Sequence, residues 1–401
     1  MSEQKTSKEL LNELLETHYD NAMKVQSEGK LLAWCTSISP QELLETMDIY
    51  AVYPENHAAA IGARKQAPDF INYSESNGYS SDLCSYARVN LAYMDILQSE
   101  AGNIPRPDLI FCCSNICNTV LKWYENISKE LNIPLIVFDT PFNHQYEVND
   151  QCTQYIKGQL LEAIGKLEQI TGRKFDHDRF REVMKISSET SKWWKKASLE
   201  AAAKPSPLNG FELFNYMAAI VCARGTVAGR DLYKLWYEEL RDKAAKGLGP
   251  WKDEDEKYRV MWDGIACWPY LGLTYKTLKK YGINMVTSTY PDSWYIVYDV
   301  DDLDGMARCY SSNYVNRNLS FGADNIVDIV NKFSLDGIVF HSNRSCKLMD
   351  FRQFEIQRQV EARTGVPSII FDGDQTDPRA FNPSQFENRI QALVEMMESR
   401  R

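Results

Sequence analysis

The strongest constraint on the fold is a pattern of features that the chain repeats near its two ends. In the first copy, residues 108–141, an apolar run ends at a Ser-Asn pair and a cysteine, and a helical pattern follows. Ile-Pro then introduces a second apolar run, which closes on Phe-Asp. In the second copy, residues 336–372, the turn reads Ser-Asn-Arg-Ser-Cys, and Val-Pro introduces a run that also closes on Phe-Asp. Each copy predicts a strand, a turn, a helix and a second strand, which is a unit of parallel sheets.

Further apolar runs extend each copy into a lobe with four strands. We expect these strands at residues 31–34, 49–53, 109–112 and 135–138, and at residues 259–262, 283–288, 337–341 and 368–371. Helical patterns separate them, so the strands should be parallel, with right-handed crossovers. The sequence therefore predicts an α/β protein of two related lobes, each with a small four-stranded parallel sheet flanked by helices, of the Rossmann or flavodoxin-like type, plus a helical domain.

The expected divisions of the chain follow from these patterns. They are an N-terminal helix at 1–28, a first α/β lobe at 29–149, a helical segment at 150–250 and a second α/β lobe at 251–401. Within the first lobe, we expect a helix from His57 to Lys65 and a polar, tyrosine-rich connection from Asn72 to Ser85.

Composition and charge exclude several classes of function. The chain has 401 residues and a formal charge of −10, which argues against nucleic acid or anionic lipid as a principal partner. Its first residues are charged and amphipathic, and no apolar run approaches the length of a membrane helix. Ten cysteines in such a chain indicate a reducing compartment, so we expect a cytoplasmic protein whose thiols serve metals or catalysis.

Several common catalytic motifs are missing from the sequence. It contains no GxGxxG after a strand, no GxxxxGK(S/T) and no GxSxG. A nicotinamide cofactor and ATP therefore lack their usual binding loops, and the nucleophile of a hydrolase lacks its turn. The α/β layout alone fits many functions, so the cysteines remain as the main chemical signal.

The cysteines are dispersed, and most are expected to be small buried hydrophobic residues. That interpretation applies to Cys112, Cys152, Cys222 and Cys309. Three others follow polar turns at predicted loop positions instead, namely Cys84, Cys117 and Cys346. Cys113 lies four residues before Cys117, a spacing that indicates a metal only weakly. The residues alone leave both metal ligands and structural thiols open.

Taken together, several motifs resemble those of the 2-hydroxyacyl-CoA dehydratase family, which includes the subunits of benzoyl-CoA reductase. The resemblance covers essentially the whole chain and rests on Cys35-Thr36-Ser37, YPENHAAAIGARK, SYARVNLAY after Cys84, LIFCCSNICNT, PLIVFDTPFN and the repeat ending in Cys346. It implies a [4Fe–4S] cluster held by Cys84, Cys117 and Cys346, with one iron left open. Cys113 is the alternative to Cys117, which we prefer because its counterpart in the repeat, Cys346, also follows the Ser-Asn turn.

The resemblance also implies a reaction and partners. An enzyme of this kind eliminates water from an (R)-2-hydroxyacyl-CoA to give the (E)-2-enoyl-CoA in amino-acid fermentation. The β-hydrogen is not acidic, and acid–base catalysis alone contributes on the order of 10²–10⁴-fold. One-electron reduction of the thioester to a ketyl radical overcomes this difficulty. The electron comes from an ATP-dependent iron–sulfur activator, and the implied assembly also includes a second, homologous subunit.

Glu55 and Ser37 are the candidate catalytic residues. Both lie in loops after the first two predicted strands, where ligands of parallel sheets bind. Glu55 would take the β-proton or handle the departing hydroxyl, and Ser37 would bind the hydroxyl or thioester oxygen. Each also has a structural interpretation, because Ser37 can cap the next helix and Glu55 can stabilise a helix start. His57 and His341 are better explained as a residue in the first turn of a helix and a buried histidine, respectively.

Three other functions remain open at this stage. The chain could be a subunit of an aromatic-CoA reductase, or the partner subunit that passes electrons without binding substrate. Ser37 and Glu55 favour the substrate-binding subunit over the latter. Two similar lobes also describe a ligand-binding protein without a cluster. The aromatic residues between 251 and 295 are expected mainly in the core, with some lining an acyl pocket, and no CoA contacts can be assigned.

Overall fold

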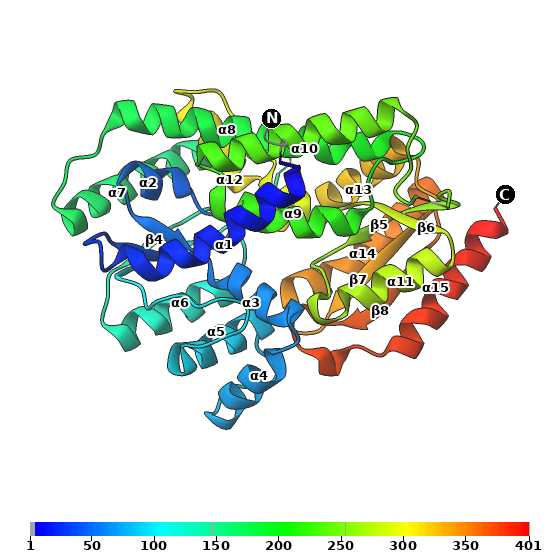
Figure 1. The fold of residues 1–401 in the computed structure, drawn as a ribbon, viewed down its shortest axis with the longest axis horizontal. Helices are drawn as coiled ribbons and strands as arrows, with labels where there is room; N and C mark the ends of the chain where they lie inside the picture. Colours follow the sequence, from blue (N-terminus) through cyan, green and yellow to red (C-terminus); the bar gives the residue numbers. More distant parts are fainter. Residues whose placement is uncertain (1–4, 146, 253, 401) are drawn as a thin grey trace.

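The computed structural model describes residues 5–145, 147–252 and 254–400. Two α/β lobes lie side by side, and long helices from the middle of the chain run across both (Figure 1). The strands of the first lobe are β1 (Leu32–Cys35), β2 (Tyr50–Val52), β3 (Leu109–Cys113) and β4 (Leu135–Phe138). Those of the second are β5 (Tyr258–Asp263), β6 (Ile283–Ser288), β7 (Gly337–Asn343) and β8 (Ser368–Gly373). Both sheets are parallel, which confirms the predicted fold class.

The two sheets share one strand order. It is β2-β1-β3-β4 in the first lobe and β6-β5-β7-β8 in the second. In each lobe the chain leaves the first strand toward one edge of the sheet and later returns to the other side of that strand. The loops after β1 and β3, and after β5 and β7, therefore diverge and leave a crevice at the carboxyl end of the sheet.

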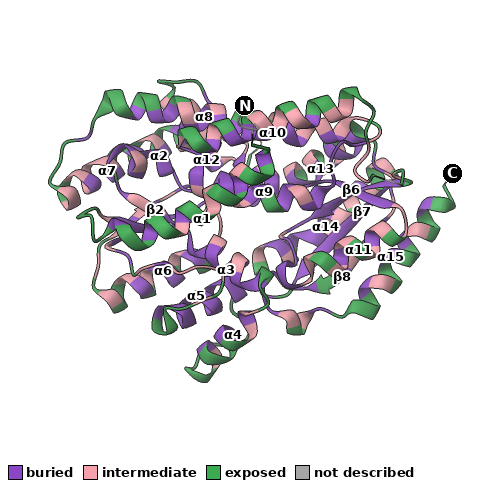
Figure 2. Ribbon diagram, viewed as in Figure 1, coloured by how far each residue is buried: buried purple, intermediate pink, exposed green. Residues whose placement is uncertain are grey.

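The strands form the cores of the lobes. Every residue of β1, β3, β5, β6 and β7 is buried, as Figure 2 shows for the strands of both lobes. Parallel strands covered by helices on both faces are buried on both sides, so they read as continuous apolar runs. This is why the strands were recognisable in the sequence.

Fifteen helices surround the sheets within the described residues. Those of the first lobe are α1 (Ser7–Val25), α2 (Gln41–Thr46), α3 (Pro54–Ala63), α4 (Ala67–Ser76), α5 (Ser85–Ile96) and α6 (Asn118–Leu131). The central helices are α7 (Asp150–Thr171), α8 (His177–Leu199), α9 (Gly210–Ala223) and α10 (Val227–Ala245). The second lobe has α11 (Leu271–Lys280), α12 (Leu303–Ser311), α13 (Leu319–Phe333), α14 (Lys347–Thr364) and α15 (Pro383–Glu398). Helix α9 contacts both α1 and β6, so it bridges the two lobes.

The first helix begins at a capping box. The side chain of Thr6 accepts a hydrogen bond from the backbone N–H of Glu9, at 3.3 Å. In return, the Glu9 carboxylate accepts one from the Thr6 backbone N–H, at 2.8 Å. This exchange satisfies two amides that would otherwise lack partners, so the helix starts sharply after Thr6.

Two local predictions were wrong. Part of the predicted polar connection forms α4 (Ala67–Ser76), because Phe70 and Ile71 give this mostly polar segment an apolar face that packs on α5. The helix expected to start at His57 instead starts at Pro54, a residue that favours the first helical position. The earlier start places Glu55 in the first turn of α3.

A buried polar network joins the first lobe to the rest of the protein. Glu42 of α2 accepts hydrogen bonds from the hydroxyls of Tyr298 and Tyr310, at 2.7 and 2.6 Å. The Arg224 guanidinium at the end of α9 lies 3.7 Å from the Glu42 carboxylate, and neither side chain is exposed. Arg224 also donates to the carbonyl of Ser39 at 3.1 Å. Because a buried charge needs partners, this network holds the loop that follows β1 in place.

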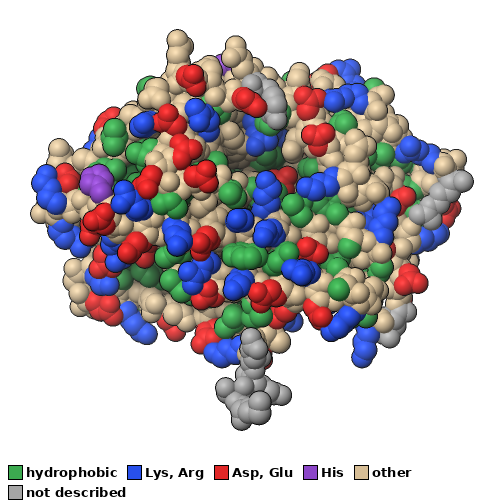
Figure 3. Space-filling view, turned by 90° about the horizontal axis from the view of Figure 1, so that it is seen from above, with side chains coloured by type: hydrophobic (Ala, Val, Ile, Leu, Met, Phe, Trp, Pro, Cys, Tyr) green, Lys and Arg blue, Asp and Glu red, His purple; other side chains and the backbone are tan. Residues whose placement is uncertain are grey.

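Charged side chains of both signs are mixed on the face of the molecule that Figure 3 shows, where Lys and Arg are interspersed with Asp and Glu. None of the helices in the described part of the chain has both the length and the hydropathy needed to cross a bilayer.

Candidate active site

A cavity of about 90 Å³ lies where the carboxyl ends of the two sheets face each other. We call it the cysteine cavity, because Cys84, Cys117 and Cys346 all line it. Its walls come from loops of both lobes, and other residues that line it are Ser37, Glu55, Tyr86, Val120, Ile265, Tyr290, Trp294 and Gln375. Cys84 and Cys346, 262 positions apart in the chain, therefore meet around one space.

Each of the three cysteines occupies the position just before a helix. Cys84 precedes α5, Cys117 precedes α6 and Cys346 precedes α14. The start of a helix carries a partial positive charge and unpaired backbone amides. Three such helix ends therefore point at the same cavity, which favours negatively charged sulfur there.

Burial has the opposite effect on these thiols. It raises the pKa of all three, and for Cys346 to about 12. The proximity of Cys346 further raises the pKa of Cys84, whereas the backbone of Val120 partly opposes the rise for Cys117. Burial therefore favours the protonated thiols, and a metal centre held by them would have to displace their protons.

The donor set fits an iron–sulfur cluster. Within the described residues, no three His, Cys, Asp or Glu side chains lie close enough together to hold a single metal ion. Ligands of one zinc ion sit only about 2.0–2.3 Å from it, whereas a four-iron cluster spreads its thiolate ligands around a larger body. Three thiols that line one cavity match the chemistry of the second case.

The alternative ligand Cys113 lies elsewhere. It is the last residue of β3, is fully buried, and is not among the described residues that line the cysteine cavity. Its backbone N–H donates to the Thr36 hydroxyl at 2.8 Å, which ties it to the loop after β1. Of the two candidates, the geometry therefore favours Cys117.

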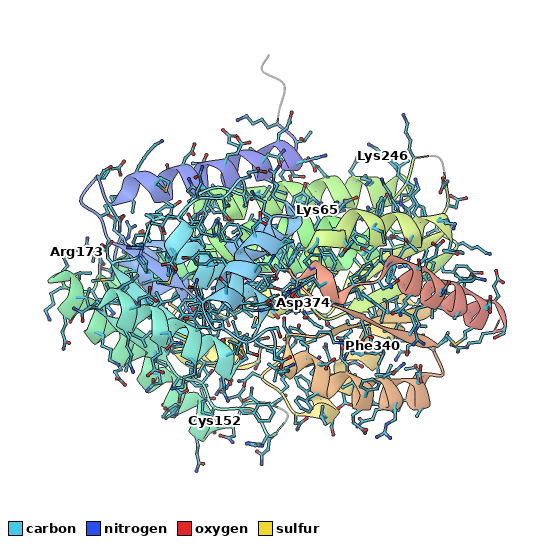
Figure 4. All side chains as sticks on the ribbon, turned by 90° about the horizontal axis from the view of Figure 1, so that it is seen from below. Lys65, Cys152, Arg173, Lys246, Phe340 and Asp374 are labelled. Atoms are coloured by element: carbon cyan, nitrogen blue, oxygen red, sulfur yellow. The ribbon has the colours of Figure 1, made fainter. Side chains whose placement is uncertain are left out.

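A single buried carboxylate connects the segments that carry Cys84 and Cys346. Asp374, in the loop after β8, accepts a hydrogen bond from the Ser85 hydroxyl at 2.5 Å. Its other oxygen accepts hydrogen bonds from the hydroxyl and the backbone N–H of Ser345, the latter at 3.1 Å. Figure 4 shows Asp374 at the centre of the molecule, between the two lobes. Because Ser85 and Ser345 adjoin Cys84 and Cys346, this carboxylate fixes the spacing of two sulfurs from different lobes.

Glu55 and Ser37 lie together at the edge of the cysteine cavity. The backbone N–H and the hydroxyl of Ser37 donate to one oxygen of Glu55, at 3.2 and 3.3 Å. The hydroxyl of Tyr124, on α6, donates to the other oxygen at 2.8 Å. Ser37 does not cap α2, which begins after Pro40 without a side-chain cap.

Burial raises the pKa of the Glu55 carboxyl above its usual range, although the bonds from Tyr124 and Ser37 oppose the rise. A carboxyl group with a raised pKa holds a proton more strongly than an exposed one, which favours its use in proton transfer. Glu55 is therefore a suitable acid–base group.

A second cavity, of about 180 Å³, adjoins the first on the other side of Glu55. We call it the apolar chamber, because helices α1, α3 and α9 line it mostly with aliphatic and aromatic side chains; examples are Leu15, Ala59, Ala60, Met217 and Ala218. Among the described lining residues, four border both cavities: Ser37, Glu55, Tyr290 and Trp294. The polar groups thus lie at the junction between an apolar space and the three thiols.

The two histidines considered in the sequence are structural. His57 lies in α3 with Nε2 2.8 Å from the carbonyl of Gly102, and burial lowers its pKa to about 4. His341 is buried in β7, with Nδ1 2.6 Å from the carbonyl of Ile265. Neither is among the described residues that line the two cavities.

Among the remaining cysteines, Cys112 is buried as expected. Cys152, Cys222 and Cys309 are partly exposed instead. Cys152 and Cys309 lie on α7 and α12, and Cys222 lies near the end of α9, so each occupies a helix surface rather than a strand core.

Sequence reasoning missed Tyr124 and Asp374. Tyr124 lies within an amphipathic helix, where an aromatic residue normally indicates packing. Asp374 follows a predicted strand, so its position at the carboxyl end of β8 was a signal that could have identified it.

Comparison with known proteins identifies a family and several relatives of the chain. Residues 36–397 match the family described as 2-hydroxyglutaryl-CoA dehydratase, D-component. The chain is 50% identical over 402 residues to the (R)-2-hydroxyisocaproyl-CoA dehydratase alpha subunit of Clostridioides difficile, covering 100% of this chain and 98% of that protein. It is 42% identical over 400 residues to the (R)-phenyllactyl-CoA dehydratase alpha subunit of Clostridium sporogenes, covering 99% and 97%. A more distant relative, at 27% identity over 97% of this chain and 94% of the other, is one of the subunits of the benzoyl-CoA reductase of Thauera aromatica.

Proposed function

The chain belongs to the family of the 2-hydroxyglutaryl-CoA dehydratase D-component, and from this premise we propose that it is the substrate-binding subunit of a 2-hydroxyacyl-CoA dehydratase. Such an enzyme is a hydro-lyase that converts an (R)-2-hydroxyacyl-CoA into the (E)-2-enoyl-CoA and water. The observation that carries the proposal is the junction at which Glu55 and Ser37 face a cavity lined by three cysteines.

Cys84, Cys117 and Cys346 would hold a [4Fe–4S] cluster in the cysteine cavity. When bound, a cluster with three protein thiolates supplies one iron without a protein ligand and a centre for one-electron transfer. Asp374 keeps the neighbours of two of these cysteines at a fixed separation through its bonds to Ser85 and Ser345. The protein thus provides the ligands and holds them in a rigid frame.

Glu55 is the proton-transfer group in this proposal. Reduction of the thioester by one electron gives a ketyl radical, which expels hydroxide and makes the β-proton acidic. Glu55 takes that proton and passes it to the departing hydroxide, so that water leaves and the carboxylate is restored. The electron returns after the elimination, and the overall reaction changes no oxidation state.

Ser37 binds the substrate hydroxyl in this arrangement. Because the Ser37 hydroxyl donates a hydrogen bond to Glu55, its oxygen can only accept a hydrogen bond from the substrate. An acceptor suits the proton of the 2-hydroxyl group and does not suit a carbonyl oxygen. Ser37 therefore places the leaving group beside the carboxyl that will protonate it.

The apolar chamber is the proposed site of the acyl chain. Its helices offer small side chains, such as Ala59, Ala60 and Ala218, next to the polar junction. Burial of apolar surface provides binding energy without directional contacts, so the chamber selects for acyl groups that are uncharged.

Two protein partners complete the proposal. The relatives are named as single subunits of dehydratases and of a reductase, which implies a second, homologous subunit. Helix α14, which starts at Cys346, presents two exposed phenylalanines on one face: Phe351 is 84% exposed and Phe354 63%. Such side chains favour burial at an interface. The electron would come from a separate ATP-dependent iron–sulfur activator.

Anaerobic purification of the chain with its partner subunit, followed by iron and sulfide analysis, tests the cluster. We expect iron and acid-labile sulfide bound to both subunits. The second step is an assay with activator, ATP, reductant and (R)-2-hydroxyisocaproyl-CoA, in which we expect the enoyl-CoA. Reduction of benzoyl-CoA instead would identify an aromatic-CoA reductase, and a colourless, iron-free complex that still binds ligand would contradict both.

A further inference from the structure

Tyr290 occupies the junction from the lobe opposite to Glu55. It follows β6 in the second lobe, whereas Ser37 and Glu55 follow β1 and β2 in the first. It borders both the cysteine cavity and the apolar chamber. A ligand that passes from the chamber to the thiols therefore lies between Tyr290 on one side and Glu55 on the other.

A chain of hydrogen bonds orients the Tyr290 hydroxyl. The indole N–H of Trp268 donates to the Tyr86 hydroxyl at 2.5 Å. The Tyr86 hydroxyl also bonds to the hydroxyl of Tyr290, and within the described residues Tyr86 is the side chain that bonds to it. Because the Tyr86 oxygen already accepts from Trp268, the Tyr86 proton is available to the Tyr290 oxygen. In that arrangement the proton of Tyr290 itself points elsewhere.

The environment keeps that proton on Tyr290. Burial raises the pKa of Tyr290 above its usual range, and the negative charge of Glu55 adds to the effect although the Tyr86 bond opposes it. Tyr290 is therefore a neutral hydrogen-bond donor across the physiological pH range.

The other groups at the junction offer no proton to a bound carbonyl before the elimination begins. Glu55 is then an acceptor, because the hydroxyls of Ser37 and Tyr124 donate to its two oxygens. The indole N–H of Trp294 donates to the backbone carbonyl of Ser37, at 3.2 Å. Among the four residues common to the two cavities, Tyr290 thus supplies the available donor.

We propose that Tyr290 is a catalytic residue that donates a hydrogen bond to the thioester carbonyl oxygen of the bound acyl-CoA. This inference rests on the proposed function. A carbonyl oxygen is an acceptor, and it gains negative charge when the thioester takes up an electron. A donor already aimed at that position stabilises the charge without rearrangement, as the donors of an oxyanion hole do.

The test uses Tyr290→Phe, which removes the hydroxyl and keeps the ring. The matched control is Tyr270→Phe, because Tyr270 belongs to the same lobe, bonds to the carbonyl of Pro378 and lies outside the described lining of both cavities. The probe is 4-methylpentanoyl-CoA labelled with ¹³C at the carbonyl, which binds but has no 2-hydroxyl to lose. Its carbonyl stretch is measured by infrared difference spectroscopy on the heterodimer.

We expect the bound carbonyl to absorb at lower frequency than in water-free solvent in the wild type and in Tyr270→Phe, and to shift upward in Tyr290→Phe. We also expect Tyr290→Phe to lower kcat/KM for the 2-hydroxyacyl-CoA by about 10²-fold, mainly through kcat, as for the loss of one oxyanion-hole donor. An unchanged carbonyl frequency in Tyr290→Phe would overturn the inference. If Tyr290→Phe does not fold, the second variant is Tyr86→Phe, which removes the bond that orients Tyr290. We expect this variant to shift the carbonyl frequency upward by a smaller amount, and the absence of any shift would overturn the inference.

The same measurement separates this inference from the proposed function. A wild-type complex that holds no iron, or that does not bind the labelled acyl-CoA, contradicts the proposed function itself. A wild-type complex that binds and dehydrates, with a carbonyl frequency that Tyr290→Phe leaves unchanged, contradicts the role of Tyr290 alone.

Discussion

The two lobes have the same strand order, but they use the same short motif in opposite ways. Tyr53-Pro54-Glu55 follows β2, and Tyr290-Pro291-Asp292 follows β6. In the first lobe the acid borders the cavities and Tyr53 is buried in the core. In the second lobe Tyr290 borders the cavities, whereas Asp292 is not among their described lining residues.

The difference is already present at the tyrosine, before the proline. Tyr53 directly follows β2 and is extended, with φ −119° and ψ 96°, whereas Tyr290 follows β6 after one further residue and is helical, with φ −64° and ψ −47°. The proline then starts an α-helix, α3, in the first lobe and a short 3₁₀ helix (Pro291–Trp294) in the second. A repeated scaffold can therefore supply both an acid–base group and a hydrogen-bond donor from one motif.

The lobes also differ in the number of proposed cysteine ligands: two come from the first lobe and one from the second. We expect the largest effect from removing the single ligand of the second lobe. Cys346→Ser removes the single cysteine ligand proposed from the second lobe. We expect loss of the cluster from this subunit and loss of dehydration, measured as iron and sulfide per heterodimer and as turnover. Cys113→Ser is the control and should leave the iron content unchanged. Loss of iron from Cys113→Ser with retention in a Cys117→Ser variant would reverse the assignment in the first lobe.

The next comparison sets the two acids of the repeated motif against each other. Glu55→Gln should lower kcat by on the order of 10²–10⁴-fold, the usual contribution of general acid–base catalysis, with the iron content intact. Asp292→Asn should leave turnover close to that of the wild type. Steady-state kinetics together with iron analysis give both results. Loss of iron in Glu55→Gln would mean that Glu55 has a structural role instead.

The connection between the lobes should be tested at Asp374. Ser85, Ser345 and nearby backbone amides all donate hydrogen bonds to the Asp374 carboxylate. Asp374→Asn replaces one of the two accepting oxygens by an amide nitrogen, which cannot accept these bonds. We expect the free energy of unfolding to fall by on the order of 3 kcal/mol, since hydrogen bonds to charged groups are worth about 1.5–3 kcal/mol each. Urea denaturation measures the change.

The control for this variant is Asp372→Asn, two residues earlier. Asp372 forms a half-exposed ion pair with Arg344, at 2.8 Å, and such pairs contribute at most about 1 kcal/mol. Equal losses of stability in the two variants would show that Asp374 does not hold the lobes together.

The smallest expected effect concerns the pH dependence of the second acid. Burial raises the pKa of Asp292 from 3.8 to about 6, although Tyr295, Arg317 and Lys195 oppose the rise. Between these pH values the folded chain holds a proton that the unfolded chain releases, so stability falls as the pH rises from about 4 to 6. Asp292→Asn removes this dependence. We expect it to stabilise the protein by on the order of 1 kcal/mol above pH 6 and to have little effect below pH 4. Thermal denaturation from pH 4 to 8 measures it, and a gain confined to low pH would contradict the prediction.

The sequence allowed the sheets to be predicted because all eight strands are short apolar runs separated by helices. The repeated Ser-Asn turns also indicated that Cys117 and Cys346 lie at equivalent loop positions. Since carboxyl-end loops of parallel strands lie at one edge of a sheet, Ser37 and Glu55 could be expected beside Cys117. These inferences used only local patterns and general rules of topology.

The remaining features depend on contacts that no local pattern encodes. Asp374 bonds to Ser85, 289 residues away, so its role appears only when the lobes are packed. Tyr124 lies within α6 and bonds to Glu55, 69 residues away, which only the packed lobe shows. Which member of each Tyr-Pro-acid motif borders the cavities depends on the backbone conformation of its tyrosine, which the sequence does not distinguish.

The division of the cysteines between two distant parts of the chain sets an order of events during biosynthesis. In the proposed assignment, a nascent polypeptide that ends at Cys117 contains two of the three ligand cysteines and none of the second lobe. The third, Cys346, is made only after the central helices and three strands of the second sheet. Cluster delivery in this assignment therefore follows the synthesis of Cys346, and products truncated before that residue cannot hold the cluster.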